Sequence, residues 1–427
     1  MTRPIRQELQ RKVHDFVLKG FHPRFGQRSG GFPSNPTWKR LAGLGTQLWL
    51  DTGNIKDARE LWTSEFSALT TNNTLLNKEV QAGTYDSLVL QANDLLSDES
   101  LDERQKILEI AFILNAYHGL RLVETFDAFV SVEEHTDLAN DYDQAVEYAR
   151  RYQAICPERF IVKIPLTPTG ILATRRCSLD GIPVNHTLGF SARQNYLVAR
   201  IARPEFVNVF LGRLNSFVVE NGLGNGQNVG EQATLASQSA IAGLRRSHGV
   251  PTRQIGASFR GGGQVRDLAG IDVMTIPPKV AKEFLELGVS VDDLTDRTGE
   301  TYKLGASPDS IPLARLDTLW RVDSQLELAL DALESEELDS FTPEDLTAFL
   351  TLHGCGDILV NWTPQQRQIS AAEGKIPRLE HWRDALHDKA VGLDALMNLG
   401  GLSSFIADQK AMDDRVVSVL AKAHQHA

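Results

Sequence analysis

Short apolar runs that end on a polar residue recur along the first two thirds of the chain. We expect eight of these runs to be strands, because they are short and rich in β-branched and aromatic side chains. Helical segments separate most of them, and strands that alternate with helices favour a (β/α)8 barrel over an open doubly wound sheet. The predicted strands are residues 46–51, 68–72, 128–132, 160–165, 182–187, 206–211, 254–258 and 271–276.

The predicted elements divide the chain into three parts. A helix near residues 6–18 belongs to an N-terminal segment, residues 1–44, and the barrel covers residues 45–300. Residues 301–427 are expected to form a helical C-terminal extension that packs on the barrel and carries no concentrated chemistry. Within the barrel, Thr136 is expected to cap a helix that ends near Tyr152. The other predicted helices are residues 55–63, 102–120, 171–179, 191–202, 280–287, 317–333, 344–352, 378–396 and 404–424.

Composition and charge narrow the function classes. The 427 residues are 42% hydrophobic and 23% charged, which is ordinary for a soluble globular protein. No apolar run is long enough to cross a bilayer, so we expect a cytoplasmic protein without a membrane partner. The net charge of −11 argues against nucleic-acid binding. The three cysteines are scattered and stand in no metal-ligand spacing, so we expect free thiols and no metal site.

The strand predicted at residues 160–165 carries a lysine, Lys163, among apolar neighbours. Burial disfavours the charged form of an amine, which is how an enzyme makes a lysine nucleophilic near neutral pH. Pro165 cannot donate to a sheet, so the strand should end there and leave Lys163 near its C-terminal tip. For an isolated lysine the simpler interpretation is a side chain that reaches from the strand end into solvent.

The other strand ends favour the catalytic interpretation. Barrel enzymes build their active sites from the C-terminal ends of the strands. Here those ends offer an amine, carboxylates for proton transfer, amides that can orient hydroxyl groups, and arginines suited to a phosphate. They carry Asp51, Asn72, Glu133, Lys163, Asn185, Thr187, Arg213, Ser258 and Arg260. No glycine-rich dinucleotide motif follows the first strand, and the glycine-rich stretch at residues 222–226 is expected to be a flexible loop.

These strand ends resemble the motifs of the transaldolases, a family of Schiff-base-forming class I aldolases. Seven motifs occur in the family's order between about residues 46 and 278, but the likeness leaves out the first forty residues and fades in the extension. The matching segments are residues 50–54 (LDTGN, for LDTAN in the family), 70–74 (TTNNT, for TTNPT), 130–133 (VSVE), 162–165 (VKIP), 185–188 (NHTL, for N-x-T-L), 210–213 (FLGR, for FVGR) and 256–260 (GASFR).

The resemblance implies a covalent mechanism that needs no cofactor. Lys163 would attack the ketone of a ketose phosphate and form a Schiff base, which withdraws electrons from the carbon–carbon bond that breaks. Asp51 would accept the proton of the C4 hydroxyl group during cleavage. Glu133 and Thr187 would hold the water that transfers protons when the imine forms and hydrolyses. The predicted catalytic residues are therefore Lys163, Asp51, Glu133 and Thr187.

The resemblance also implies a substrate-binding set, with sugar phosphates as the partners. Two amides, Asn72 and Asn185, would bind the hydroxyl groups of the dihydroxyacetone fragment. Arginines would grip the terminal phosphate. The sequence leaves open whether the protein forms a homodimer. The predicted substrate-binding residues are Asn72, Asn185, Asn208, Phe210, Arg213, Ser258 and Arg260.

Three positions depart from the family pattern. Asn73 stands where the family has proline, which is expected to loosen the turn beside Asn72 without removing a reacting group. Asn208 stands where many members have serine, which leaves the sugar preference open. Residues 261–263 are glycines after Arg260, so a different anion or acceptor also stays open.

Three alternatives remain at this point. A fructose 6-phosphate aldolase-like enzyme would release dihydroxyacetone, but that relative carries glutamine and tyrosine where this chain has Glu133 and Phe210. A transferase that acts on a different sugar is the second alternative. The third is a catalytically silent barrel that serves as a binding module, and the intact Lys163 argues against it.

Overall fold

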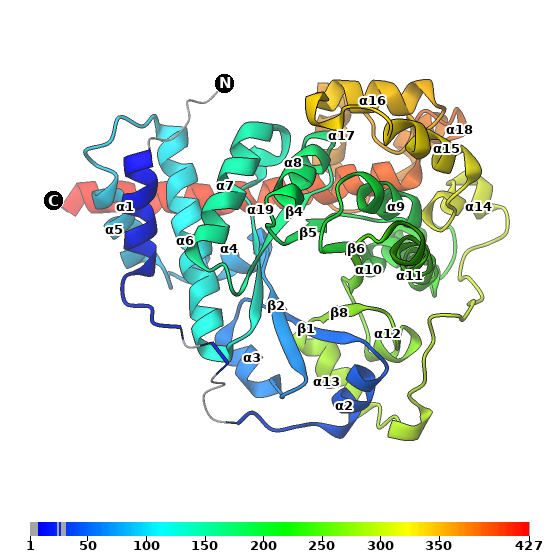
Figure 1. The fold of residues 1–427 in the computed structure, drawn as a ribbon, viewed down its shortest axis with the longest axis horizontal. Helices are drawn as coiled ribbons and strands as arrows, with labels where there is room; N and C mark the ends of the chain where they lie inside the picture. Colours follow the sequence, from blue (N-terminus) through cyan, green and yellow to red (C-terminus); the bar gives the residue numbers. More distant parts are fainter. Residues whose placement is uncertain (1–6, 24, 27–30, 427) are drawn as a thin grey trace.

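The computed structural model describes residues 7–23, 25–26 and 31–426. Its eight parallel strands pair in sequence order, and β1 pairs with β8 to close a barrel (Figure 1). The predicted (β/α)8 barrel is therefore confirmed. The strands are β1 (Gln47–Asp51), β2 (Phe66–Thr70), β3 (Phe129–Glu133), β4 (Phe160–Pro165), β5 (Val184–Thr187), β6 (Phe206–Phe210), β7 (Arg253–Ala257) and β8 (Val273–Ile276).

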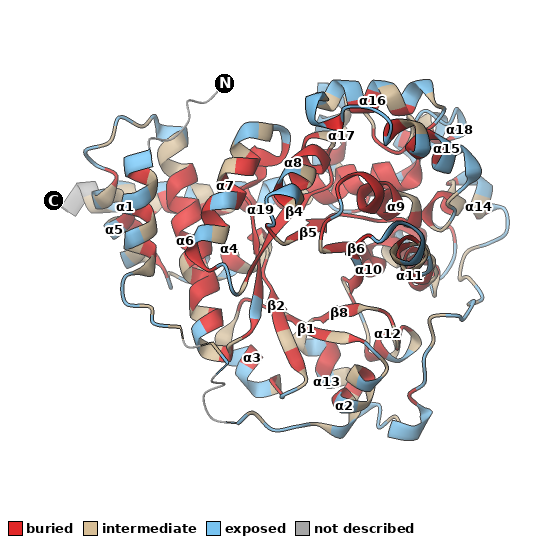
Figure 2. Cartoon of the chain, viewed as in Figure 1, coloured by how far each residue is buried: buried red, intermediate tan, exposed pale blue. Residues whose placement is uncertain are grey.

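The barrel interior is apolar in one layer and polar in the next. Strands β4 and β5 are buried along their whole length (Figure 2). Trp49 and Phe206 meet edge to face across the interior, with ring centres 4.7 Å apart. Side chains alternate along a strand, so the inward positions two residues further on, Asp51 and Asn208, come toward the C-terminal mouth. Lys163 pairs in register with Glu133 on one side and Asn185 on the other.

Most of the predicted helices occur close to their predicted positions, although the structure also contains helices that were not predicted. Residue 6, the first of the predicted N-terminal helix, lies outside the described residues. The corresponding helices are α1 (Gln7–Leu18), α3 (Ile55–Leu61), α6 (Glu103–Phe126), α8 (Pro168–Leu179), α9 (Ala192–Ile201), α13 (Pro278–Glu286) and α16 (Pro343–Leu352). Helices that the pattern did not predict are α2 (Pro36–Gly43), α4 (Asn73–Gln81), α5 (Asp86–Leu95), α10 (Leu211–Glu220), α11 (Val229–His248), α12 (Gly262–Asp267), α14 (Ser310–Leu313) and α17 (Pro364–Glu373).

Two helix starts differ from the prediction. Thr136 does not cap a long helix, because Thr136–Asn140 is a separate 3₁₀ helix. Helix α7 (Tyr142–Ile155) begins after it, where Asp141 accepts the Gln144 N–H at 3.1 Å. The helix predicted at residues 317–333 is likewise divided into a short 3₁₀ helix and α15 (Ser324–Leu333), which Asp323 caps. In both cases an aspartate nearer the apolar stretch supplies the cap.

The prediction for the C-terminal part of the extension was wrong. The segment predicted as residues 378–396 divides into α18 (Leu379–His387) and the start of α19 (Leu393–His426), which continues without a break through residues 404–424. The glycine pair Gly400 and Gly401 favoured a break, but packing overrides that propensity. A Cβ at Gly401 would lie 3.1–3.4 Å from Leu188, Phe190 and Arg213. The helix therefore stays intact and passes close to the barrel.

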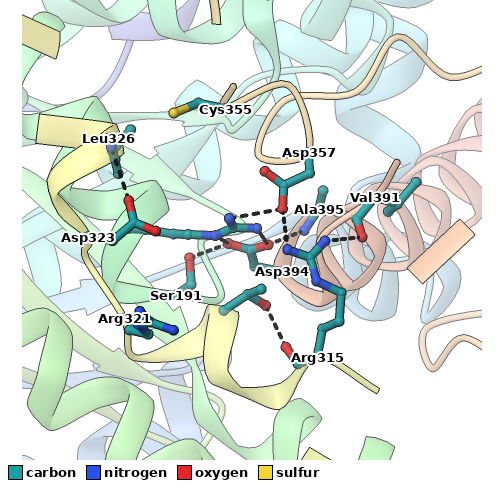
Figure 3. Close-up of polar contacts among 12 residues, drawn as sticks. Ser191, Arg315, Arg321, Asp323, Leu326, Cys355, Asp357, Val391, Asp394 and Ala395 are labelled. Atoms are coloured by element: carbon teal, nitrogen blue, oxygen red, sulfur yellow. Dashed lines mark hydrogen bonds and ion pairs between the residues drawn. The ribbon is translucent and has the colours of Figure 1, made fainter. Parts of the chain in front are cut away.

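Helix α19 contacts α4 and α5 at one end and α17 nearer its start (Figure 1). Its first turn carries Asp394, which is fully buried and bonded to Ser191, the N-cap of α9 (Figure 3). One turn later, the Asn398 amide donates to the carbonyls of Leu166 and Leu188, each at 3.0 Å. These two turns of α19 are thus fixed to the loops that follow β4 and β5.

No helix among the described residues is long and apolar enough to cross a membrane. The stretch at residues 222–226 is a loop, as predicted, and its Gly224 bridges to Ala306 in the chain that leads into the extension.

Candidate active site

The C-terminal ends of the strands surround a cavity of about 480 Å³. Two of the predicted site residues, Glu133 and Thr187, do not line it, although Glu133 contacts Lys163. The structure brings the others together around the one cavity. The predicted residues that line it are Asp51, Asn72, Lys163, Asn185, Asn208, Phe210, Arg213, Ser258 and Arg260.

Lys163 forms a buried pair with Glu133. Only 4% of the lysine and 2% of the glutamate is exposed, so Lys163 does not reach into solvent. The Lys163 Nζ lies 3.4 Å from Glu133 Oε1 and donates to the Thr71 carbonyl, also at 3.4 Å. Burial raises the pKa of Glu133, while the charge of Lys163 and the Asn73 N–H act against that rise. A carboxyl group tuned in this way beside an amine can exchange protons with it.

Asp51 lies at the end of β1 and is partly exposed to the cavity. Its Oδ1 accepts the Thr70 hydroxyl at 2.7 Å, and that hydroxyl also lies 2.6 Å from the Thr275 hydroxyl. Loss of solvation raises the pKa of Asp51, against the opposing effects of Thr70, Lys163 and Arg260. A raised pKa makes a carboxylate a stronger base, which suits removal of a proton from a hydroxyl group.

Amide side chains connect three strands in one chain of hydrogen bonds. Asn185 donates to the Ser131 hydroxyl at 3.1 Å, and Asn208 donates to Asn185 Oδ1 at 3.1 Å. Asn208 Oδ1 in turn accepts the Gly189 N–H at 3.3 Å. The asparagine found where serine is common in the family thus orients Asn185. The third amide of the site, Asn72, caps α4, because its Oδ1 accepts the Leu75 N–H at 2.8 Å.

Two buried oxygens of the predicted catalytic residues have no hydrogen-bond partner among the described residues. One is Glu133 Oε1, and the other is the Thr187 hydroxyl, whose residue is fully buried. Buried polar groups are rarely left without a partner, and ordered water commonly supplies it. Thr187 follows Lys163 across the register between β4 and β5, opposite Pro165. The predicted water site is compatible with this arrangement.

Arg213 lines the same cavity as Lys163 and forms no ion pair with a carboxylate of the described residues. It is 8% exposed, and its Nη1 has no hydrogen-bond partner among the described residues. Burial and the nearby charge of Arg260 lower the pKa of Arg213 to about 10. Its Cζ lies 5.3 Å from the centre of the Phe210 ring. A buried arginine without a carboxylate partner is suited to bind an anionic ligand. Arg260 is exposed beside it, and Ser258 adopts a left-handed φ of 64°.

The extension contributes residues that the sequence analysis missed. Phe405 on α19 lines the cavity, and its ring centre lies 5.5 Å from both Lys163 Nζ and Arg213 Cζ. Asp408 accepts a hydrogen bond from Thr74 at the start of α4. The missed lining residues of the extension are Lys375, Ser404, Phe405 and Asp408. The extension therefore lines the cavity, which the sequence analysis did not predict. A signal was available in the three- to four-residue spacing of Asn398, Gly401, Phe405 and Asp408.

The chain is similar to one family model and to several proteins described as transaldolases. Residues 48–349 match the family model "Transaldolase/Fructose-6-phosphate aldolase". A transaldolase of Yersinia pseudotuberculosis serotype O:3 (strain YPIII) is 29% identical over 294 residues, which cover 67% of this chain and 90% of that protein. Transaldolase A of Pasteurella multocida is 28% identical over 299 residues, which cover 69% and 90%. A transaldolase of Edwardsiella ictaluri is 29% identical over 261 residues, which cover 60% and 81%.

Proposed function

The chain belongs to the transaldolase/fructose-6-phosphate aldolase family, and we propose that it is a transaldolase working through a Schiff base on Lys163. It moves a dihydroxyacetone unit from a ketose phosphate, such as fructose 6-phosphate or sedoheptulose 7-phosphate, to an aldose phosphate. The observation that carries the proposal is that Lys163, which pairs with the buried Glu133, lines one cavity together with Arg213, whose Nη1 has no hydrogen-bond partner among the described residues.

Imine formation begins when the neutral Lys163 amine attacks the ketone carbon. Protons must leave the nitrogen and reach the departing oxygen, which leaves as water. Glu133 lies 3.4 Å from the amine and serves as the proton carrier, through a water held between it and Thr187. Hydrolysis of the imine is the reverse of this step and uses the same groups.

Cleavage requires a base at the C4 hydroxyl group. Asp51 takes that proton, the bond between C3 and C4 breaks, and its electron pair moves toward the iminium nitrogen to give an enamine. The aldose phosphate leaves, and the three-carbon fragment stays on Lys163. Asn72 and the Asn185–Asn208 amide pair bind its hydroxyl groups. Addition of the enamine to an acceptor aldehyde returns the proton from Asp51.

Arg213 and Arg260 hold the terminal phosphate, with Ser258 as a further donor. Arg213 Cζ and Lys163 Nζ each lie 5.5 Å from the centre of the same Phe405 ring, so they are at most about twice that distance apart. This separation suits a six-carbon sugar phosphate whose ketone carbon lies at Lys163 while its phosphate binds Arg213. With such substrates the enzyme would act in the pentose phosphate pathway, in the cytoplasm.

Reductive trapping tests the proposal. Borohydride reduction in the presence of fructose 6-phosphate, followed by peptide mass mapping, should give a three-carbon adduct on Lys163. The Asp51→Asn variant should still form the imine but trap the intact sugar, because its amide cannot take the proton. Absence of any adduct on Lys163 would refute the proposal. Continuous release of free dihydroxyacetone without an acceptor would instead identify a fructose 6-phosphate aldolase-like enzyme.

A further inference from the structure

Glu133 is held by a second donor besides Lys163, the main-chain N–H of Asn73. This N–H donates to Glu133 Oε2 at 2.8 Å, while Glu133 Oε1 faces Lys163. The Asn73 side chain donates to the main-chain carbonyl of Glu134 at 3.4 Å. Asn73 is fully buried and is the first residue of α4. The loop after β2 is therefore tied to the end of β3 at the carboxylate itself.

This contact depends on the departure from the family pattern at Asn73. The transaldolase pattern TTNPT has proline at this position, and this chain reads TTNNT. Proline has no N–H, so a chain with proline there cannot form this hydrogen bond. From the sequence, Asn73 is expected to loosen the turn beside Asn72, and the structure shows that the residue also supplies a donor to Glu133.

We propose that Asn73 is a positioning residue whose main-chain N–H holds the Glu133 carboxylate in its ionised form beside Lys163. The inference deepens the proposed function, since Glu133 is the proton carrier of the imine steps there. A hydrogen bond from an N–H to a carboxylate is charge-assisted and directional. It fixes one oxygen of Glu133 and leaves the other, which has no hydrogen-bond partner among the described residues, for the amine and for water.

The other groups that face Glu133 can be separated from this effect. They are Lys163 on β4, Arg213 on α10, Tyr152 on α7, whose hydroxyl donates to the Glu133 carbonyl at 3.5 Å, and the adjacent Glu134. Burial raises the pKa of Glu133, and the Asn73 N–H is one of the effects that oppose the rise. A change at Asn73 leaves the other groups in place, so a shift between variants reports the N–H.

Two substitutions of Asn73 isolate the N–H. Asn73→Pro removes it, whereas Asn73→Ala keeps it and removes only the side-chain contact. Proline should be accepted, because residue 73 is the first residue of a helix and Asn72 before it is extended, with φ −156° and ψ 169°. We expect the acidic limb of the pH profile for imine formation to move up by about one pH unit in Asn73→Pro. In Asn73→Ala the limb should stay at the wild-type position.

The measurement is the initial rate of borohydride-trapped adduct on Lys163 with fructose 6-phosphate as a function of pH. Equal shifts in both variants, or none in either, would overturn the inference. A Glu133→Gln background serves as the control, because Asn73→Pro should cause no further shift once the titrating group is gone.

Hydrogen exchange supplies a second test that does not depend on catalysis. In the wild-type protein the Asn73 amide should be protected, and Glu133→Ala should make that single amide exchange at least about 10-fold faster. An unchanged exchange rate would overturn the inference even if Lys163 traps the sugar. Conversely, failure to trap any sugar together with the expected exchange result would refute the proposed function and leave the hold on Glu133 intact.

Discussion

Two buried ion pairs near the mouth of the barrel differ in how fully their hydrogen bonds are made. Asp394 on α19 accepts two hydrogen bonds from Arg193, at 2.7 and 2.8 Å, one from the Ser191 hydroxyl at 2.6 Å and one from the Ala395 N–H at 3.0 Å. Glu133 and Lys163 lie 3.4 Å apart, and Glu133 Oε1 has no hydrogen-bond partner among the described residues. The first pair is saturated, because both carboxylate oxygens of Asp394 accept hydrogen bonds. In the second pair, one carboxylate oxygen of Glu133 can still accept one.

The saturated pair also extends outward. Arg193 contacts Asp357 at 3.0 Å, and Asp357 pairs with Arg315 at 2.8 Å, as part of the cluster in Figure 3. A Cβ at Gly392 would lie 2.0 Å from an Arg193 nitrogen, so a larger residue there would force the guanidinium group to move. These paired charges hold the start of α19 against α9. Where oxygens and nitrogens are left unpaired, as at Glu133, Thr187 and Arg213, the site can bind water or substrate.

The largest expected effect is at the unsaturated pair. Lys163→Ala should lower turnover of fructose 6-phosphate by roughly 10⁴-fold or more, because the covalent centre is gone. The folded structure should survive, since the replacement also removes a buried charge. Steady-state kinetics and thermal unfolding measure both. Lys163→Arg is the control for charge, and it should be as inactive as the alanine variant. Turnover within about 10-fold of wild type would contradict the Schiff base.

The second effect breaks the saturated pair. Asp394→Ala leaves the Arg193 guanidinium buried without its main partner, and we expect a loss of about 3–5 kcal/mol in the free energy of unfolding. Urea titration measures it. The matched control is Asp339→Ala, because Asp339 pairs with Arg175 at 2.9 Å and its side chain is 68% exposed. That exposed pair should contribute less than about 1 kcal/mol. Similar losses in the two variants would show that saturation does not matter here.

The third effect concerns the free guanidinium of the cavity. Arg213→Ala should lower kcat/KM for fructose 6-phosphate by about 100-fold, the value of a charge-assisted pair of 2–3 kcal/mol. With unphosphorylated fructose the loss should be small. Arg260→Ala should lose less than Arg213→Ala, because Arg260 is exposed. An equal loss with both sugars would mean that Arg213 supports the barrel and does not bind phosphate.

The smallest effect is at Glu134, a buried acid next to the pair. Neither of its carboxylate oxygens has a hydrogen-bond partner among the described residues, and burial raises its pKa well above the ordinary 4.5. The folded protein therefore keeps this proton to a higher pH than the unfolded chain does. Stability falls as the pH rises above the unfolded value, by about 1.4 kcal/mol per pH unit until the folded value is reached.

Glu134→Gln removes this titration while it keeps the size of the side chain. Between about pH 5 and pH 6 the free energy of unfolding of the variant should therefore rise relative to that of the wild-type protein, by about 1.4 kcal/mol per pH unit. Urea unfolding at each pH measures this difference. A difference in unfolding free energy that is independent of pH would show that Glu134 has a partner in solution. Bound water is the candidate for that partner.

The sequence by itself determined the barrel and the positions of most site residues. The strands are short apolar runs with polar ends, a local pattern, and parallel strands in sequence order bring those ends to one mouth. Asp51, Lys163 and Arg213 could therefore be assigned to one site before any distance was known. The motifs added the family, which the comparison bears out over residues 48–349.

Only the tertiary structure decided what the extension does and which polar groups stay unpaired. Phe405 is an ordinary apolar position of a helix until α19 is packed beside the barrel, and the continuous helix itself overrides the break that Gly400 and Gly401 favour. The Asn73 N–H could not be assigned either, because a main-chain donor has the same chemistry at every residue except proline. Its acceptor, Glu133, lies sixty residues away in the chain, and only the parallel pairing of β2 with β3 brings the two residues together.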